Sequence, residues 1–114
     1  MVFLAETLRK ICNPHWVLNY FLMALETTVF TFKISVPFSE WTKGFDSPEV
    51  AAMHEANSMK PLYRGVSKDD PESVVVIQQA EEGVAKEFFE ANREAVEATG
   101  HIWDSTVITN YLAN

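Results

Sequence analysis

Residues 26–112 switch repeatedly between the two-residue periodicity of β-strands and the 3.6-residue periodicity of α-helices, and the order of these switches leaves few possible folds. The strand-like segments are rich in β-branched and aromatic residues, and stretches that contain Pro, Gly or Asp separate them. The expected elements are, in order, a strand at 26–35, helical pieces at 38–45 and 48–57, strands at 62–67 and 73–79, a helix at 81–99 and a strand at 102–112.

The resulting order β-α-β-β-α-β predicts an α+β protein with ferredoxin-like topology, in which one four-stranded antiparallel sheet carries two helices on one face. In the first strand, Phe30, Phe32 and Ile34 share one side and are expected to face the helices. The last helix is expected to bury one apolar stripe, formed by Val84, Phe88, Ala91, Ala95 and Ala98.

The length and charge of the chain narrow its function further. With 114 residues it is long enough for one domain with one core. Nine Lys and Arg residues against 16 Asp and Glu residues give a net charge of −7, which argues against non-specific binding to nucleic acid or to an anionic membrane. The single Cys12 cannot form an internal disulfide. We therefore expect a soluble, cytoplasmic protein that binds neither nucleic acid nor membrane.

Residues 1–25 differ from the rest in pattern and charge, and we expect them to be an extension to a domain formed by residues 26–114. The apolar run from Tyr20 to Leu25 is too short for a membrane span, which needs about 20 residues. Two alternatives remain open. Residues 1–22 are either an appendage, with Met23 as the natural start, or a helix that packs on the domain.

Several polar or aromatic side chains lie on elements that can line a pocket. The candidate ligand-binding residues are Trp41, His54, Tyr63, Arg64, Trp103 and Asp104, with Gln78, His101 and Ser105 as further positions. If the protein binds a ligand, Arg64 is the expected anchor, because a guanidinium binds a carboxylate or a phosphate through two hydrogen bonds. The favoured alternative is a surface arginine that pairs with a Glu or Asp side chain of the protein. If Arg64 is buried, Asp104 is its expected partner within the protein.

The remaining signals favour structural roles. We expect His54 on a solvated edge of a helix and His101 in the loop after Gly100. Gly65 in the second strand marks a bulge or a close approach of the backbone, and the bulge is favoured. No metal and no cofactor are expected, because the histidines lack ligand spacing and no nucleotide-binding glycine motif is present.

Three short motifs carry a resemblance to a known family. The sequences FSEW, FDS and RGVSKDDP, the last followed by a valine-rich strand, are similar to those of a small uncharacterised family of cyanobacterial domains of unknown function. The resemblance covers about residues 26–108. The topology also resembles the dimeric α+β barrel group, which includes small cofactor-free monooxygenases and stress-response proteins. This second resemblance implies a dimer but supplies no catalytic residues.

Apolar residues on both sides of the strands predict that the sheet face without helices is an interface. Val29 and Phe30 point to opposite faces, as do Val75 and Val76, and the alternation also places Trp103 opposite Ile108. We therefore expect a homodimer formed through the open sheet face, which binds a partner or a small molecule without catalysis. The alternative is a cofactor-independent monooxygenase, lyase or isomerase, and a closed cavity lined by His and Tyr would favour it. A third hypothesis is an adaptor that presents the acidic helix to a basic partner.

Overall fold

The computed structural model describes residues 25–112 of the chain. Both alternatives for residues 1–22 lie outside the described residues. The elements are β1 (Leu25–Ile34), α3 (Phe38–Phe45), α4 (Pro48–Ala56), β2 (Lys60–Val66), β3 (Ser73–Glu81), α5 (Val84–Ala91), α6 (Arg93–Ala98) and β4 (His101–Leu112).

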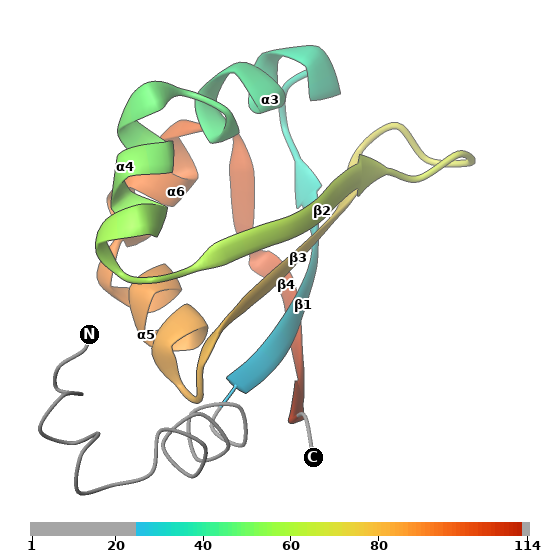
Figure 1. Cartoon of the computed structure of the whole chain (residues 1–114). Helices are drawn as coiled ribbons and strands as arrows, with labels where there is room; N and C mark the ends of the chain where they lie inside the picture. Colours follow the sequence, from blue (N-terminus) through green and yellow to red (C-terminus); the bar gives the residue numbers. More distant parts are fainter. Residues whose placement is uncertain (1–24, 113–114) are drawn as a thin grey trace, which may run out of the picture.

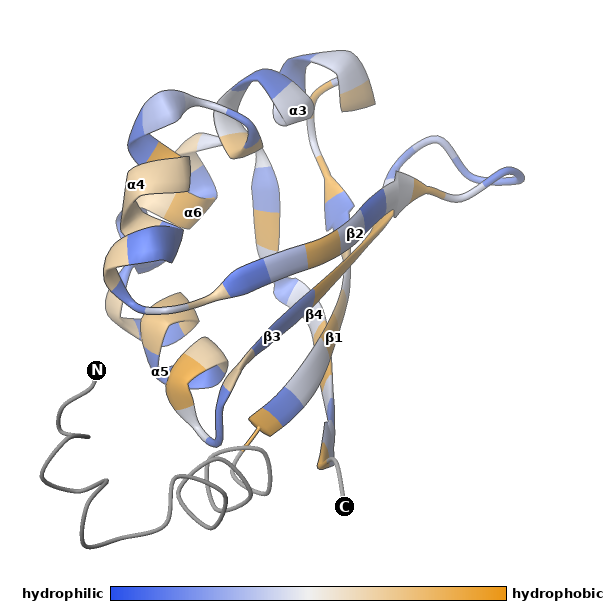
Figure 2. Ribbon diagram, viewed as in Figure 1, coloured by the Kyte–Doolittle hydropathy of each residue, from blue (hydrophilic) through white to orange (hydrophobic). Residues whose placement is uncertain are grey.

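The four strands form one antiparallel sheet in the order β2-β3-β1-β4, and the helices lie together on one face of it (Figure 1). The predicted ferredoxin-like fold is therefore confirmed, with each predicted helical region built from two short helices. Strand β1 is central because its alternating apolar residues pair with β3 on one side and β4 on the other. The loop between β2 and β3 is hydrophilic, as expected of a solvated hairpin turn (Figure 2).

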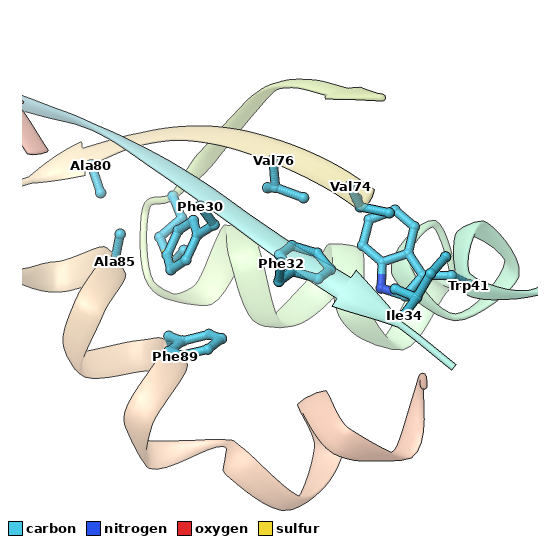
Figure 3. Packing of buried hydrophobic residues seen from close by; sticks show 10 residues of the cluster. Phe30, Phe32, Ile34, Trp41, Val74, Val76, Ala80, Ala85 and Phe89 are labelled. Carbon is cyan, nitrogen blue, oxygen red and sulfur yellow. The ribbon is translucent and has the colours of Figure 1, made fainter. Parts of the chain in front are cut away.

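The core lies between the sheet and the helices (Figure 3). Strand β1 contributes Phe30, Phe32 and Ile34, which are all buried, as their two-residue spacing predicts. Helix α3 contributes Trp41, and α5 contributes Phe89, whose ring centroid lies 5.1 Å from that of Phe30. Aromatic rings from β1, α3 and α5 thus contact one another between the two layers.

The predicted helix over 81–99 is wrong in two respects. Strand β3 continues to Glu81, and the helix breaks at Asn92, whose φ of −113° and ψ of 33° are not helical. The Asn92 side chain donates a 2.8 Å hydrogen bond to the carbonyl of Phe88, which competes with the helical pattern at this point. The buried residues of α5 are therefore Ala85 and Phe89, whereas Ala91, Ala95 and Ala98 are exposed and Phe88 is half-buried.

Strand β4 also departs from strict alternation. Its register against β1 shifts between the pairs Thr31–Val107 and Lys33–Ile102, so β4 carries extra residues there. Ser105 stabilises the irregularity, since its hydroxyl accepts a 2.7 Å hydrogen bond from the Lys33 amide. As a result, Trp103 and Ile108 both pack against the core, and their predicted placement on opposite faces is wrong.

Candidate functional site

A cavity of about 100 Å³, partly open to solvent, lies between the helix-covered face of the sheet and the four helices. Its apolar lining consists of Phe30, Phe32, Trp41, Phe45, Val50, Met53, Val76, Phe88, Phe89, Ala95 and Val96. Its polar lining consists of His54, Gln78, Asn92, Thr99 and His101. Predominantly apolar walls with a few polar groups are typical of small-molecule sites.

His54 lies in the cavity wall rather than on a solvated helix edge, so that expectation is wrong. The ring is buried between those of Phe45 and Phe88, at centroid distances of 5.6 and 5.7 Å. Val50 precedes His54 by four residues on the same helix and lines the same cavity, so helical spacing does account for the placement. Burial lowers the pKa of His54 and favours the neutral imidazole.

A hydrogen bond joins His54 to the sheet. The Gln78 Nε2 atom on β3 donates to His54 Nε2 at 3.1 Å, since an amide nitrogen can only donate. Gln78 is also buried, and it belonged to the wider set of predicted pocket residues. The pair therefore connects α4 to β3 across the cavity.

His101 is the first residue of β4 and is buried, so its expected loop position is also wrong. Its ring stacks on Phe32 with a centroid distance of 3.8 Å and an interplanar angle of 15°. His101 Nε2 lies 2.7 Å from the Thr106 hydroxyl, which itself donates to the carbonyl of Trp103. Burial lowers the pKa of His101 from 6.5 to about 4, so it is neutral at pH 7.

Arg64 pairs with Asp46 and not with Asp104. Its Nε and Nη2 atoms donate to the two carboxylate oxygens of Asp46 at 3.0 and 2.5 Å. Its guanidinium also lies 5.8 Å from the ring centroid of Phe38. Strands β2 and β4 are at opposite edges of the sheet, which excludes a contact between Arg64 and the exposed Asp104. Arg64 thus forms a partly exposed pair with Asp46, the residue that follows α3, as the favoured alternative predicted.

A groove of about 590 Å³ adjoins the cavity between α4 and β2. Its lining includes Asp46, Tyr63 and Arg64. Phe45 and His54 line both the groove and the cavity, so these two side chains stand in the wall between them. Of the predicted site residues, the structure therefore brings His54 together with Trp41 at the cavity and with Arg64 and Tyr63 at the groove.

The remaining predicted residues lie elsewhere. The Trp103 ring stacks on that of Phe89 with a centroid distance of 4.3 Å, and the Cζ atom of Arg93 lies 4.7 Å from the Trp103 ring centroid. Trp103 is not among the residues that line the cavity. Sequence reasoning missed Asn92 and Thr99 as lining residues. For Asn92 the sequence did hold a signal. Asparagine favours helix ends over helix interiors, so its place within an otherwise helical pattern indicates a helix break there.

The opposite face of the sheet carries exposed apolar side chains. Tyr63, Val107 and Tyr111 are each 59% exposed. The Tyr63 ring lies over Gly65, where a Cβ atom would come within 2.6 Å of its hydroxyl. Gly65 thus permits a close approach, and the bulge of β2 lies instead between Pro61 and Tyr63.

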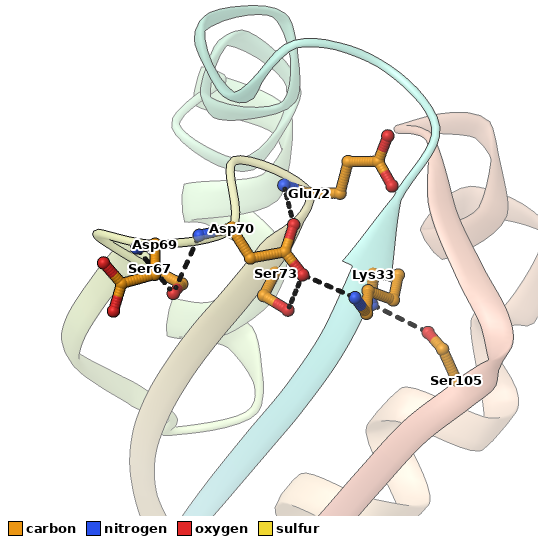
Figure 4. A network of polar contacts seen from close by, with 7 residues as sticks. All are labelled: Lys33, Ser67, Asp69, Asp70, Glu72, Ser73 and Ser105. Carbon is orange, nitrogen blue, oxygen red and sulfur yellow. Dashed lines mark hydrogen bonds and ion pairs between the residues drawn. The ribbon is translucent and has the colours of Figure 1, made fainter.

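A polar cluster lies at the hairpin end of this open face (Figure 4). Lys33 Nζ lies 2.6 Å from a carboxylate oxygen of Asp70, and the same carboxylate accepts from Ser73 and from the Glu72 amide. These contacts hold the hairpin turn against the end of β1. The Asp70 carboxylate of the acidic turn is therefore bonded to neighbouring protein groups, as expected of a structural hairpin turn.

Within residues 25–112, no group of three or more His, Cys, Asp and Glu side chains is close enough together to hold a metal ion. None of the helices in that part of the chain is both long and apolar enough to cross a membrane.

Comparison with known proteins gives a family and a fold. Residues 25–113 match the family described as domain of unknown function DUF3764. No curated protein matches the chain. SnoaB from Streptomyces nogalater, a cofactor-independent oxygenase, is 15% identical over 80% of this chain and 94% of its own, with a TM-score of 0.55.

Two further solved structures are similar. A monooxygenase from the gene ActVA-Orf6 of Streptomyces coelicolor, in complex with the ligand nanaomycin D, is 16% identical over 81% of this chain and 89% of its own, with a TM-score of 0.54. A NIPSNAP family protein from Agrobacterium tumefaciens is 11% identical over 79% of this chain and 86% of its own, also with a TM-score of 0.54. At these identities the likeness establishes the fold alone.

Proposed function

We infer that this chain, which belongs to the DUF3764 family of domains of unknown function, is a homodimeric protein that binds a small, mainly apolar molecule in the cavity beneath its helices without transforming it. The cavity with its buried polar lining is the observation that carries this proposal. A location in the cytoplasm is part of the same proposal and rests on the expectations from composition.

The polar side chains that line the cavity support ligand binding more strongly than the volume of the cavity does. Protein interiors are close-packed, and voids larger than a water molecule are few. Burying a polar group without a full set of partners costs about 1–3 kcal/mol. Three of the buried polar side chains, His54, Gln78 and His101, line this one space. A bound molecule that supplies the missing hydrogen bonds would recover that cost.

The open sheet face supports the homodimer. Its exposed apolar side chains include Val107 and Tyr111 on β4 and Tyr63 on β2. An apolar surface of this kind is typical of a protein interface, and the dimeric α+β barrel group, whose fold the chain shares, is named for such pairing. A second copy offers the same apolar face, so one surface satisfies both protomers.

Two measurements test the proposal. Light scattering at micromolar concentration is expected to give a mass near twice the 12.9 kDa of the chain. Calorimetric titration of the full chain with small aromatic compounds, beginning with benzene and phenol, is expected to detect saturable binding of at least one. A monomeric mass would overturn the dimer, and the absence of binding by every compound would overturn the ligand site.

A cofactor-independent monooxygenase, or a related lyase or isomerase, is the second candidate. The neutral imidazole of His101 in the cavity favours it, because it can accept a proton from a bound substrate. Mass spectrometry of a bound compound before and after incubation in air separates the two candidates. An unchanged compound is expected if the protein only binds, and a stoichiometric mass change with repeated turnover would favour the enzyme.

A further inference from the structure

We propose that the cavity selects an uncharged ligand of about one aromatic ring that bears a hydroxyl group, and that the fixed tautomers of His54 and His101 make this selection. The inference rests on the proposed function, because it names the class of molecule that the cavity binds. Its evidence is the direction of each hydrogen bond in the wall.

His54 presents a donor. Its Nε2 atom accepts the hydrogen bond from the Gln78 amide, so the proton of the neutral ring is on Nδ1. Within residues 25–112, neither Nδ1 of His54 nor the amide oxygen of Gln78 has a hydrogen-bond partner. Both side chains are more than nine-tenths buried and line the cavity. This part of the wall therefore offers one N–H donor beside one carbonyl acceptor.

His101 presents an acceptor. The Thr106 hydroxyl already uses its proton in the 2.7 Å bond to the carbonyl of Trp103, so it accepts from His101 Nε2. The proton of the neutral His101 ring is thus on Nε2, and its Nδ1 carries a lone pair. No described residue donates to this atom. A ligand hydroxyl can donate a hydrogen bond to Nδ1 of His101 and can also accept one from an N–H donor such as that of His54.

The charges around the site exclude ions. Among residues 25–112, no Lys, Arg, Asp or Glu side chain lines the cavity, and Asp46 and Arg64 lie in the outer groove, where they neutralise each other. An ionised carboxylate or amine would enter an apolar space with no opposite charge, which is strongly unfavourable. Aromatic walls such as Phe88 and Phe89 favour a ring over a flexible polar molecule.

The volume limits the ligand to about one ring. A dry cavity of about 150 Å³ accommodates benzene. The cavity described here is smaller, at about 100 Å³. A fused multi-ring compound would need the helices to move apart, whereas a single substituted ring needs only small adjustments of the lining side chains.

Binding of phenol, benzene and benzoate to the full chain at pH 7 tests the proposal. Phenol is expected to bind about tenfold more tightly than benzene, since one net hydrogen bond to a buried partner is of that order. Benzoate is expected not to bind. Equal affinities for phenol and benzene would overturn this inference and leave the proposed function intact, whereas no binding of any compound would contradict both. Tighter binding of benzoate would also overturn the inference.

Nitrogen-15 NMR of the imidazole rings provides a readout that does not depend on ligand binding. The proton is expected on Nδ1 of His54 and on Nε2 of His101, and the opposite tautomer at either ring would overturn the assignment. In Thr106→Val, His101 loses its fixed partner, and the preference for phenol over benzene is expected to fall. Thr109→Val, the same change at an exposed position of β4, is the matched control and is expected to keep the preference.

Discussion

The two faces of the sheet are built from the same strands but differ in what covers them. On one face, Phe30 and Phe32 are buried beneath four short helices, and a cavity remains between the layers. On the other face, Val107 and Tyr111 stay exposed because no described element covers them. Alternation along a strand thus produces two apolar faces, of which residues 25–112 cover only one. The helices pack on the covered face, and we propose that a second copy of the chain packs on the open face.

The largest loss of unfolding free energy is expected for a substitution at the buried side of α5. Phe89→Ala removes a buried ring that contacts Phe30, and it is expected to cost about 3–5 kcal/mol of unfolding free energy. Phe88→Ala, at the half-buried neighbour, is the matched control and is expected to cost less. Urea denaturation of both variants measures the two losses. A larger loss for Phe88→Ala would show that the helix faces the sheet differently.

Acidification is expected to weaken the covered face through His101. Its pKa is lowered from 6.5 to about 4 by burial, so the unfolded chain binds this proton more readily than the folded protein between those two values. The stability that neutral His101 contributes is complete above pH 6.5 and is lost as the pH falls toward 4, a loss of about 3 kcal/mol. His101→Gln is expected to show a smaller decrease in unfolding free energy between pH 7 and pH 4. Identical decreases in the variant and the original chain would contradict this assignment.

On the open face, a charge is expected to separate the protomers without unfolding them. Val107→Asp places a carboxylate at a position that is 59% exposed in the single chain. In the dimer that we propose, this carboxylate would be buried without a partner, and light scattering is expected to give the monomeric mass. Ala91→Asp adds the same charge to the exposed surface of α5 and is expected to leave the mass unchanged. Dissociation by both variants would argue against an interface at the open face.

The smallest effect is expected at the edge of the covered face. Arg64 and Asp46 form a two-pronged pair whose side chains are 36% and 48% exposed. Exposed ion pairs contribute about 0–1 kcal/mol, so Arg64→Lys is expected to change the unfolding free energy by less than about 1 kcal/mol. It is also expected to leave phenol binding unchanged, because Arg64 does not line the cavity. Loss of phenol binding in this variant would restore Arg64 as a ligand anchor.

The sequence predicts the elements and their order well. In β1 and β3, for example, apolar residues recur at every second position because one face of each strand is buried, and this pattern can be recognised in the sequence alone. It does not predict the break at Asn92 or the irregularity at Ser105, since each depends on hydrogen bonds formed in the folded chain. The pairing of Arg64 with Asp104 is a different kind of error. The predicted topology already places their strands at opposite edges of the sheet, so the strand order alone excludes the contact.

The candidate site is predicted only in part. Trp41 and His54, two of the candidate ligand-binding residues, line the cavity, yet His54 was expected at a solvated edge. Its burial follows from the placement of α4 over Gln78 on β3, a contact between residues 24 positions apart. The size of a cavity depends on how several helices pack, and no local pattern in a sequence encodes that quantity.

The central claim is that the covered face contains a ligand site and the open face does not. A titration with phenol, followed through the amide resonances of the full chain, tests this most directly. We expect saturable shifts at Gln78, His54 and His101, with the resonances of Val107 and Tyr111 unchanged. Shifts centred on Val107 and Tyr111, or no saturable shifts at the cavity residues, would contradict the account.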